Sequence, residues 1–562
     1  MTRVAGASRR GRRRRRGLGW TGLAWLIALP LIIPLLVVFW GIFAPDPEAW
    51  QHLREHVLAE VVANTAWLVV GVAVGTGLLG TTLAWLVATC DFPGRRHFGW
   101  ALLLPMAMPA YVMGFVLIGL LEYAGPVQSL MREWFGPDAG LPEIRSRLGV
   151  TLALVLVLYP YVYLIARNAF ATQGGRALET ARSLGMGPVS GFFRVALPLA
   201  RPWIAAGIML SVMETLADFG TVAVFNYETF TTAIYSTWYG MFSLEGAMKL
   251  SSVLVFFVFI VLVLEQLSRR RARFTGFSGT PPSRFRLRGW KAGAATGLCV
   301  FVLLLGFAIP AGQLMLWAIG ELAEVDGRYF GFAGRSLGLA AMAAVTALIL
   351  ALLLSYAARR APALLTQLGA RVATLGYAIP GPVLAVGIFV PLAGLGGLLQ
   401  GAADRLWGED AIEIVLHGTL FALLAAYIAR FLAVAYGPVN ANLLRVPHSL
   451  DDAARGMGVG MFGLMSRIHL PLVRGGLLTG AILVFVDVMK EMPITLMMRP
   501  FGWDTLAIRI YEMTAEGHWE RAAVPAVVLV LVGLIPVILL TLRLEREGQG
   551  VRGRAEEMPH AA

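Results

Sequence analysis

Twelve apolar stretches follow one another along this chain, each close to or beyond the roughly 20 residues needed to cross the hydrocarbon core of a bilayer. Of the 562 residues, 57% are apolar and only 14% are charged, whereas soluble globular proteins carry roughly 25% charged residues. We therefore exclude a soluble enzyme, a disordered protein and a fibrous repeat, and expect an all-α integral membrane protein. The predicted spans are 20–43, 63–89, 99–121, 149–170, 203–226, 247–266, 291–319, 335–357, 372–398, 414–436, 475–498 and 522–542.

Basic residues gather at the ends of the predicted spans, although the formal net charge of +13 would also suit a nucleic-acid-binding protein. With the N-terminus in the cytoplasm, the predicted cytoplasmic segments hold 35 Lys and Arg and the opposite side holds ten. Positive residues favour the cytoplasmic side and contact anionic lipid. We therefore expect both termini in the cytoplasm, contact with membrane lipid and no nucleic-acid partner. The first apolar region is too long for a cleaved signal peptide, so we expect it to remain as an anchor.

The chain repeats itself with an offset of 273 residues. Glu-Thr-Ala-Arg-Ser-Leu-Gly at 179–185 is followed after nine residues by Val-Ala-Leu-Pro, and Asp-Ala-Ala-Arg-Gly-Met-Gly at 452–458 is followed after nine by Ile-His-Leu-Pro. Upstream, the Tyr-to-Arg string at 163–167 matches the one at 427–430 only in a shifted register, which predicts extra residues in the second loop.

Six spans separate the two motifs, an even number, so both motifs face the same side and the repeats are parallel. Inverted repeats are typical of many secondary transporters. We predict two parallel six-helix repeats within the following layout: an Arg-rich cytoplasmic head at 1–19, the first repeat at 20–266, a basic cytoplasmic linker at 267–290, the second repeat at 291–543 and a cytoplasmic tail at 544–562.

Each cytoplasmic motif is predicted to form a short helix, a reversal at glycine and a second helix that ends at proline. An acidic residue near the helix N-terminus suits the helix dipole, and glycine allows the reversal. The proline then falls in the first turn of a new membrane helix, a position that it tolerates. Because two such helical loops occur with the same internal spacing, we expect them to be docking elements rather than helices that merely lie on the membrane. The predicted docking residues are Glu179, Ala181, Gly185, Leu197, Pro198, Asp452, Ala454, Gly458, Leu470 and Pro471.

The pattern Glu-x-Ala-x-x-x-Gly, nine residues and Ile/Val-x-Leu-Pro resembles the EAA loop of bacterial ABC importer permeases, with Thr180, Val195 and Asp452 as mild departures. The strings at 216–221, 229–235, 490–495 and 499–507 are similar to those of fused iron(III) transport permeases. The resemblance implies the type I importer permease fold, in which the EAA loop is a coupling helix that inserts into a groove on the ATP-binding subunit.

The resemblance also implies a set of partners. Two copies of an ABC ATP-binding subunit would bind ATP and Mg, a periplasmic solute-binding protein would deliver iron(III), and this chain would bind no cofactor itself. The implied location is the bacterial inner membrane. Two alternatives stay open: the same machine with another small solute such as a polyamine, thiamine or sulfate, and a cation-coupled secondary transporter.

No P-loop lysine is available in this sequence. The three lysines, Lys249, Lys291 and Lys490, follow Met, Trp and Met, whereas a P-loop needs Gly-Lys-Ser/Thr. We therefore expect a translocation subunit without catalytic residues, with ATP hydrolysed by separate polypeptides. His-Leu-Arg-Glu-His at 52–56 matches a zinc-hydrolase string, but no convincing third ligand follows downstream, so we predict no metal site.

Four acidic residues recur at symmetric positions in predicted spans. Glu214 and Asp218, and likewise Asp487 and Glu491, are predicted to share one helix face because they are four residues apart. An ionised carboxylate in a membrane helix costs roughly 2.5–3.5 kcal/mol and usually faces the interior or a water-filled path. Two interpretations remain: the four residues line a translocation pathway for a cationic substrate, or they form an interhelical network, with Lys490 neutralising part of the second pair.

Pro109 and Pro380 fall in the third predicted span of each repeat. Proline removes a backbone hydrogen bond and kinks a helix, and membrane helices use such kinks near cavities. We therefore predict two kinked, pathway-lining helices, with simple packing irregularity as the alternative.

Overall fold

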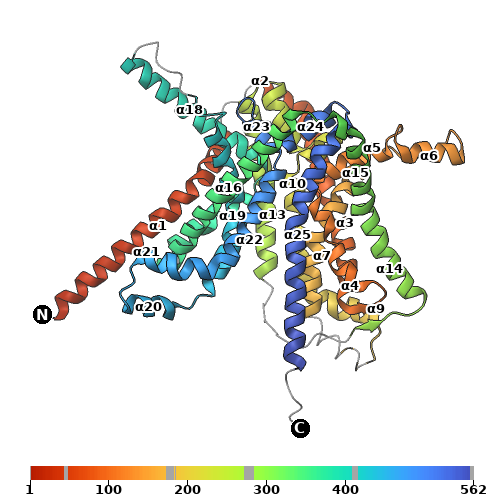
Figure 1. The fold of residues 1–562 in the computed structure, drawn as a ribbon. Coiled ribbons are helices and arrows are strands. Elements are labelled where there is room, and N and C mark those ends of the chain that lie inside the picture. Colours follow the sequence, from red (N-terminus) through yellow and green to blue (C-terminus); the bar gives the residue numbers. More distant parts are fainter. Residues whose placement is uncertain are drawn as a thin grey trace, which may run out of the picture. The chain divides into compact units, whose positions relative to one another are not determined.

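The computed structural model describes residues 2–43, 48–172, 181, 183, 185–270, 284–407 and 415–556, and within these ranges helices dominate (Figure 1). Among the described residues, twelve helices are long and apolar enough to cross a membrane, and each overlaps one predicted span, so the predicted all-α membrane fold is confirmed. They are Leu18–Gly41, Glu48–Thr89, Ala110–Phe135, Arg147–Ala171, Val189–Ala217, Leu244–Leu264, Trp290–Glu324, Gly327–Arg360, Gly381–Leu406, Leu420–Leu444, Phe462–Lys490 and Trp519–Leu539.

The α-helices are named in chain order. Those of the first half are α1 (Thr2–Gly41), α2 (Glu48–His52), α3 (Leu58–Thr89), α4 (Arg95–Ala101), α5 (Ala110–Leu121), α6 (Pro126–Phe135), α7 (Arg147–Thr172), α9 (Pro188–Gly191), α10 (Leu197–Ala217), α11 (Gly220–Val224), α12 (Phe230–Tyr235) and α13 (Leu244–Arg270). Those of the second half are α14 (Trp290–Leu303), α15 (Ile309–Glu321), α16 (Gly327–Arg360), α17 (Leu364–Ala373), α18 (Gly381–Trp407), α19 (Leu420–Leu444), α20 (His448–Gly456), α21 (Met461–Leu464), α22 (Leu470–Lys490), α23 (Pro493–Met498), α24 (Leu506–Ala515) and α25 (Trp519–Glu556).

Shorter elements connect these helices. The 3-10 segments are η2 (Leu104–Ala107), η6 (Leu322–Glu324) and η7 (Leu375–Ala378), and the π-helical segments are η1 (Leu53–Val57), η3 (Phe192–Ala196), η4 (Ser236–Gly240), η5 (Leu304–Ala308) and η8 (Met465–His469). Strands β1 (Cys90–Asp91) and β2 (Phe285–Arg286) form a two-residue parallel pair.

The chain packs as two compact units that differ from the two sequence repeats. Unit 1 comprises Met1–Glu55, Ala233–Val255 and Asp326–Arg509, and unit 2 comprises His56–Thr232, Phe256–Val325 and Ile510–Ala562. In unit 1, α1 packs against α16, α17 and α18. In unit 2, α15 packs against α5 and α25. The first helix of each predicted repeat is therefore packed with helices of the other repeat.

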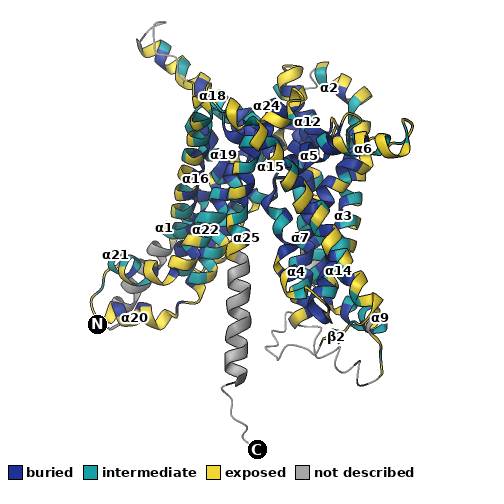
Figure 2. Cartoon of the chain, turned by 45° about the vertical axis from the view of Figure 1, so that its right-hand side comes forward, coloured by how far each residue is buried: buried dark blue, intermediate teal, exposed yellow. Residues whose placement is uncertain are grey.

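Each unit is built around three helices that the repeat relates: α3, α7 and α10 in unit 2, and α16, α19 and α22 in unit 1 (Figure 1). Figure 2 shows α3, α7, α16, α19 and α22 coloured by burial. Small residues allow the close approach, as is usual between membrane helices. A methyl group added at Gly207 would lie 2.8 Å from the Cα of Val162, and one at Gly480 would lie 3.3 Å from the Cα of Ala435.

These contacts correct one sequence alignment. Val162 and Ala435 are 273 residues apart, as are the starts of α7 and α19, so the offset continues upstream without a shift. The shifted match between 163–167 and 427–430 is therefore wrong. The side chains also have different partners: the Arg167 guanidinium donates to the Gly99 carbonyl in unit 2, whereas Arg430 pairs with Glu491 in unit 1.

Candidate functional site

The two repeated motifs have the same backbone structure wherever both are described. We call residues 181, 183 and 185–198 the first loop segment and residues 448–471 the second loop segment. Gly185 has φ +81° and Gly458 has φ +80°, the left-handed region that glycine adopts at helix ends. The Met186 N–H donates to the Ala181 carbonyl at 3.0 Å, and the Val459 N–H donates to the Ala454 carbonyl at 3.0 Å. The predicted helix and glycine reversal are therefore present in the second segment. In the first segment, Glu179 lies outside the described residues.

The second helix of each motif does not end at its proline, as we had predicted. Instead, α9, η3 and α10 run on without a break, and so do α21, η8 and α22. Pro198 and Pro471 are the second residues of α10 and α22, directly after a π-helical segment. A proline ring normally clashes with the carbonyl four residues earlier. The wider π turn before it, in which the Leu197 N–H donates to the Phe192 carbonyl, lets the helix continue into the membrane.

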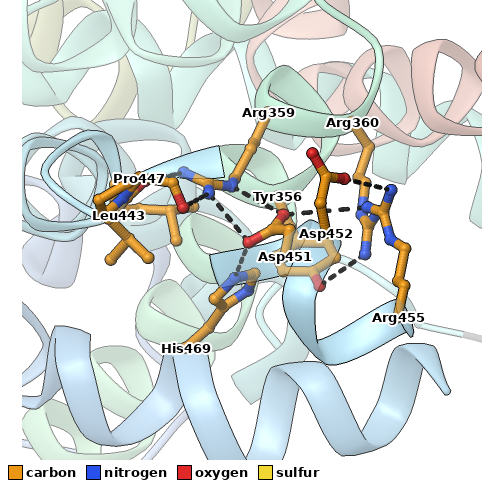
Figure 3. Close-up of polar contacts among 10 residues, drawn as sticks. Tyr356, Arg359, Arg360, Leu443, Pro447, Asp451, Asp452, Arg455 and His469 are labelled. Atoms are coloured by element: carbon orange, nitrogen blue, oxygen red, sulfur yellow. Dashed lines mark hydrogen bonds and ion pairs between the residues drawn. The ribbon is translucent and has the colours of Figure 1, made fainter. Parts of the chain in front are cut away.

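A buried charged cluster holds the second loop segment (Figure 3). We call Arg359, Asp451 and His469 the Asp451 cluster. Asp451 Oδ1 lies 3.0 Å from Arg359 Nη2 and 2.8 Å from His469 Nε2, and the Asp451 side chain is only 4% exposed. Burial alone raises the pKa of the Asp451 carboxyl, but the hydrogen bonds from Arg359 and His469 outweigh it and lower the pKa. Asp451 is therefore held as a carboxylate between two nitrogen donors.

Arg359 also binds the end of a membrane helix. Its Nη1 donates to the carbonyl of Leu443 at 3.0 Å, in the last turn of α19, and to the carbonyl of Val446 at 2.8 Å, two residues beyond the end of α19. Carbonyls at a helix end lack partners within the helix. One side chain at the end of α16 thus joins α19 to the beginning of α20. The His469 ring on η8 is fully buried and lies 5.4 Å from the Tyr356 ring.

The sequence motif points to Asp452, whereas the acidic residue of the buried cluster is its neighbour, Asp451. Asp452 is 75% exposed, and its Oδ1 lies 3.5 Å from Arg455 Nη1. The buried residue is Asp451, whose partners lie 92 and 18 residues away along the chain. No local spacing could reveal that set, because Arg359, Asp451 and His469 come from three different elements.

The first loop segment lacks these charges. The residues 273 positions before His469 and Arg359 are Ala196 and Leu86. An aromatic anchor made of Trp85, Phe170 and Phe192 lies beside it instead: the Trp85 ring is 4.9 Å from the Phe192 ring and 5.5 Å from the Phe170 ring. Ala181 and Ala196 are buried nearby in the same unit. Equivalent backbones are therefore held by apolar contacts in one unit and by ionic contacts in the other.

The acidic pairs in the membrane do not share a helix face, so that prediction is wrong. α10 ends at Ala217 and α22 at Lys490, which leaves Asp218 and Glu491 on extended backbone just beyond the helix. Each carboxylate accepts a backbone N–H from the short helix that follows: Val222 donates to Asp218 at 3.1 Å, and Ile494 donates to Glu491 at 3.0 Å. N–H groups at a helix start need such acceptors. This geometry favours the network interpretation for Asp218 and Glu491.

Glu214 and Asp487 are placed differently. Both lie within the last turn of their helices and are partly exposed. They are therefore the two members of the acidic set that lie within membrane helices.

A buried network surrounds Glu491 in unit 1. Its Oε2 lies 3.7 Å from Arg430 Nε in the middle of α19, and the Tyr427 hydroxyl is hydrogen-bonded to that of Thr495 at 2.6 Å. A methyl group at Gly381 would lie 2.8 Å from Arg430 Nη1 and 3.2 Å from Glu491 Oε1, so a larger residue there would displace the side chains of this network. The network therefore links α19 to the segment that follows α22 and to the start of α18.

Pro109 and Pro380 do not kink a continuous helix, which corrects the prediction. Pro109 is the N-cap of α5, and Pro380 immediately precedes α18; each follows a 3-10 segment, η2 or η7. Proline has no N–H to lose at a helix start, so it initiates these helices rather than bending them. Within the described ranges, no three His, Cys, Asp or Glu side chains converge as metal ligands.

A family of binding-protein-dependent transport system inner membrane components matches twice, over residues 77–273 and 347–547. The chain belongs to this family. The Fe(3+)-transport system permease protein FbpB 2 of Haemophilus influenzae is 28% identical over 529 residues, which is 92% of this chain and 97% of that protein.

Shorter relatives match about half of the chain. A probable molybdenum ABC transporter permease protein of Haloferax volcanii is 31% identical over 42% of this chain and 86% of its own length. The sulfate transport system permease protein CysT of Synechococcus elongatus is 26% identical over 46% of this chain and 95% of its own length.

Membership identifies the chain as an ABC permease of a binding-protein-dependent importer, and so confirms the resemblance drawn from the motifs. Such a permease works with an ATP-binding subunit and a substrate-binding protein. Both loop segments lie within the two matched regions. The importer class, rather than a secondary transporter, is therefore the class of this protein.

Proposed function

We propose that this chain is the complete membrane pathway of an importer for iron(III), with both termini in the cytoplasm and one ATP-binding subunit docked at each loop segment. The supporting observation is the extent of the match to the Fe(3+) permease, which covers 92% of this chain and 97% of that relative. Both repeats and their connection are therefore shared, whereas the molybdenum and sulfate permeases correspond to less than half of the chain.

The loop segments have the surface that docking needs. In the second segment, Met457 and Phe462 are strongly exposed on either side of the Gly458 turn. In the first, Val189 and Phe193 are exposed after Gly185. Exposed apolar side chains on a fixed turn fill pockets on a partner protein. We infer that these side chains enter grooves on two ATP-binding subunits, and that η3 and η8 pass the movement to α10 and α22.

Glu214 and Asp487 are our candidates for a cation pathway. They occupy equivalent positions near the ends of α10 and α22, and hard oxygen donors suit Fe³⁺. In the double variant Glu214→Gln with Asp487→Asn, we expect iron(III) uptake to fall by about ten-fold or more while the complex still assembles. Unchanged uptake by an assembled complex would remove these residues from the pathway.

The cargo itself is tested by reconstitution. The permease, its ATP-binding subunit and the solute-binding protein of the same transport system are placed in proteoliposomes, and ATP-dependent accumulation of ⁵⁵Fe(III), molybdate and sulfate is compared. We expect accumulation of iron(III) alone. An oxyanion is the second candidate because the half-length relatives carry the names of molybdenum and sulfate permeases, and accumulation of either oxyanion without iron would establish it instead.

A further inference from the structure

Two phenylalanine side chains in unit 1 are almost completely exposed. Phe501 is 106% exposed and Phe242 is 90% exposed. Both lie at the end of the unit opposite to α20: α22 leads away from the second loop segment for 21 residues, or about 31 Å, before α23 and the Phe501 turn follow. Figure 1 shows α20 at the lower end of this unit and α23 at the upper end.

The Phe501 turn has a fixed shape. The Trp503 N–H donates to the Pro500 carbonyl at 3.1 Å, and Gly502 has φ +76°, the value that a type II turn requires at its third position. An ion pair between Arg499 Nε and Asp504 Oδ1 at 3.0 Å closes the base of the turn. Arg335 Nε also donates to the Asp504 carbonyl at 3.1 Å, which attaches the base to α16.

Phe242 has an unfavourable backbone conformation. Its φ of +54° lies in the left-handed region, where a bulky L-residue is a genuine outlier. The helix ends at Gly185, Gly458 and Gly517 reach the same region with glycine. Here the Ser243 N–H donates to the Thr237 carbonyl at 3.0 Å, and a phenylalanine occupies the turn. A glycine at position 242 would relieve this backbone strain, but the chain retains phenylalanine there. Backbone strain of this kind concentrates at functional positions.

The two turns arise from neighbouring, buried backbone. The Tyr239 hydroxyl donates to the Met497 carbonyl at 2.6 Å, three residues before Phe242 and four before Phe501. Met498, Thr505 and Leu506, which flank the Phe501 turn, are buried. Both phenylalanines therefore lie beyond the ends of the membrane spans, exposed on turns between helices.

The geometry points to Phe242 and Phe501 as the anchor side chains that dock the soluble substrate-binding protein, a step that rests on the importer function proposed above. The ATP-binding subunits take the α20 end, so the opposite end is where substrate arrives. Rigid aromatic side chains on preorganised turns bind a partner's apolar pockets with little loss of conformational freedom. The partner is thus a globular protein whose contact surface carries apolar pockets.

The test uses Phe242→Gly and Phe501→Ser in the full permease complex in nanodiscs. The measured quantity is the concentration of the system's solute-binding protein that gives half-maximal stimulation of ATP hydrolysis. We expect this concentration to rise about ten-fold in each variant, with basal hydrolysis unchanged. Phe242→Gly relieves the strained backbone, so its thermal stability should equal or exceed that of the original chain.

Phe330→Ser is the matched control, because Phe330 is also strongly exposed and lies in the first turn of α16, at the same end of unit 1. It should leave the half-maximal concentration unchanged. Unchanged values in both test variants, or an equal rise in the control, would overturn the inference, the second outcome indicating a general contact with lipid. If the original complex shows no stimulation at all, the proposed function fails, and the docking inference fails with it.

Discussion

The two loop segments have the same backbone and different anchors. Both turn at a left-handed glycine, both continue through a π-helical segment, and both place proline second in the following membrane helix. In unit 2 the segment lies beside the Trp85, Phe170 and Phe192 rings, whereas in unit 1 it is fixed by the buried Asp451 cluster. The geometry of each loop segment is thus set by its backbone turns, while its attachment to the unit depends on side chains that the repeats do not share.

The largest effect should come from Arg359→Ala. Removing one partner of a buried ion pair costs about 3–5 kcal/mol, because the remaining charge stays buried without compensation. We expect hydrogen exchange to accelerate strongly in α20 and at the end of α19, with no change in the first loop segment. Arg455→Ala is the control, since its side chain is about half exposed and lies 3.9 Å from Asp451. If both variants behave alike, the charged cluster does not hold the second segment.

Replacing the turn glycines tests what the two segments share. Nothing lies within 4 Å of a methyl group built at Gly185 or Gly458, so Gly→Ala adds only the cost of the left-handed backbone, about 1–2 kcal/mol. We expect the same loss of exchange protection in each segment and the same decrease in binding of the ATP-binding subunit. A loss confined to one segment would show that the backbones are not equivalent.

Acid should distinguish the two anchors. The folded pKa of Asp451 is lowered, so its stabilising contribution is complete above the ordinary aspartate pKa of about 3.9 and is lost as the pH falls through the lowered folded value. We expect exchange protection of α20 to decline below about pH 4, while residues packed on the aromatic anchor, whose rings carry no titratable group, keep theirs. Asp451→Asn should abolish the difference in pH response between the two segments. A parallel decline in both would contradict this assignment.

The smallest effect on stability should follow Asp452→Asn. An exposed ion pair contributes at most about 0.5–1 kcal/mol, and Asp452 is 75% exposed beside Arg455. We expect thermal unfolding to be unchanged within error. The motif nevertheless predicts a docking role for Asp452, so binding of the ATP-binding subunit should weaken several-fold. If Asp452→Asn bound the ATP-binding subunit as well as the original chain, Asp451 would be the acidic residue on which this motif depends.

Sequence patterns predicted what depends on local composition or on the repeat. Hydropathy located all twelve spans, and the offset of 273 residues predicted the turns at Gly185 and Gly458. The helix breaks before Asp218 and Glu491 were missed because the apolar composition continues across them. Their cause is a hydrogen bond that each carboxylate accepts from a backbone N–H of the next short helix, which is a contact and not a sequence pattern.

Other features depend on residues far apart in sequence. Nothing in the local sequence distinguishes Asp451 from Asp452. Only the fold brings Arg359 and His469 into contact with Asp451. The strained backbone of Phe242 has no local signature at all, since glycine is the residue that normally predicts such a turn. Pro109 and Pro380 were located correctly but interpreted as kinks, because the sequence does not show whether a proline begins a helix or interrupts one.

The interleaved composition of the two units has a consequence for biosynthesis. Unit 1 needs both Met1–Glu55 and Asp326–Arg509, and unit 2 needs both His56–Thr232 and Ile510–Ala562. Neither can be completed when the ribosome has made only the first repeat, so the contacts of α1 with α16, α17 and α18 form only after those helices have been inserted. Severing the gene between the repeats should therefore yield two fragments that become protease-resistant only when they are produced together.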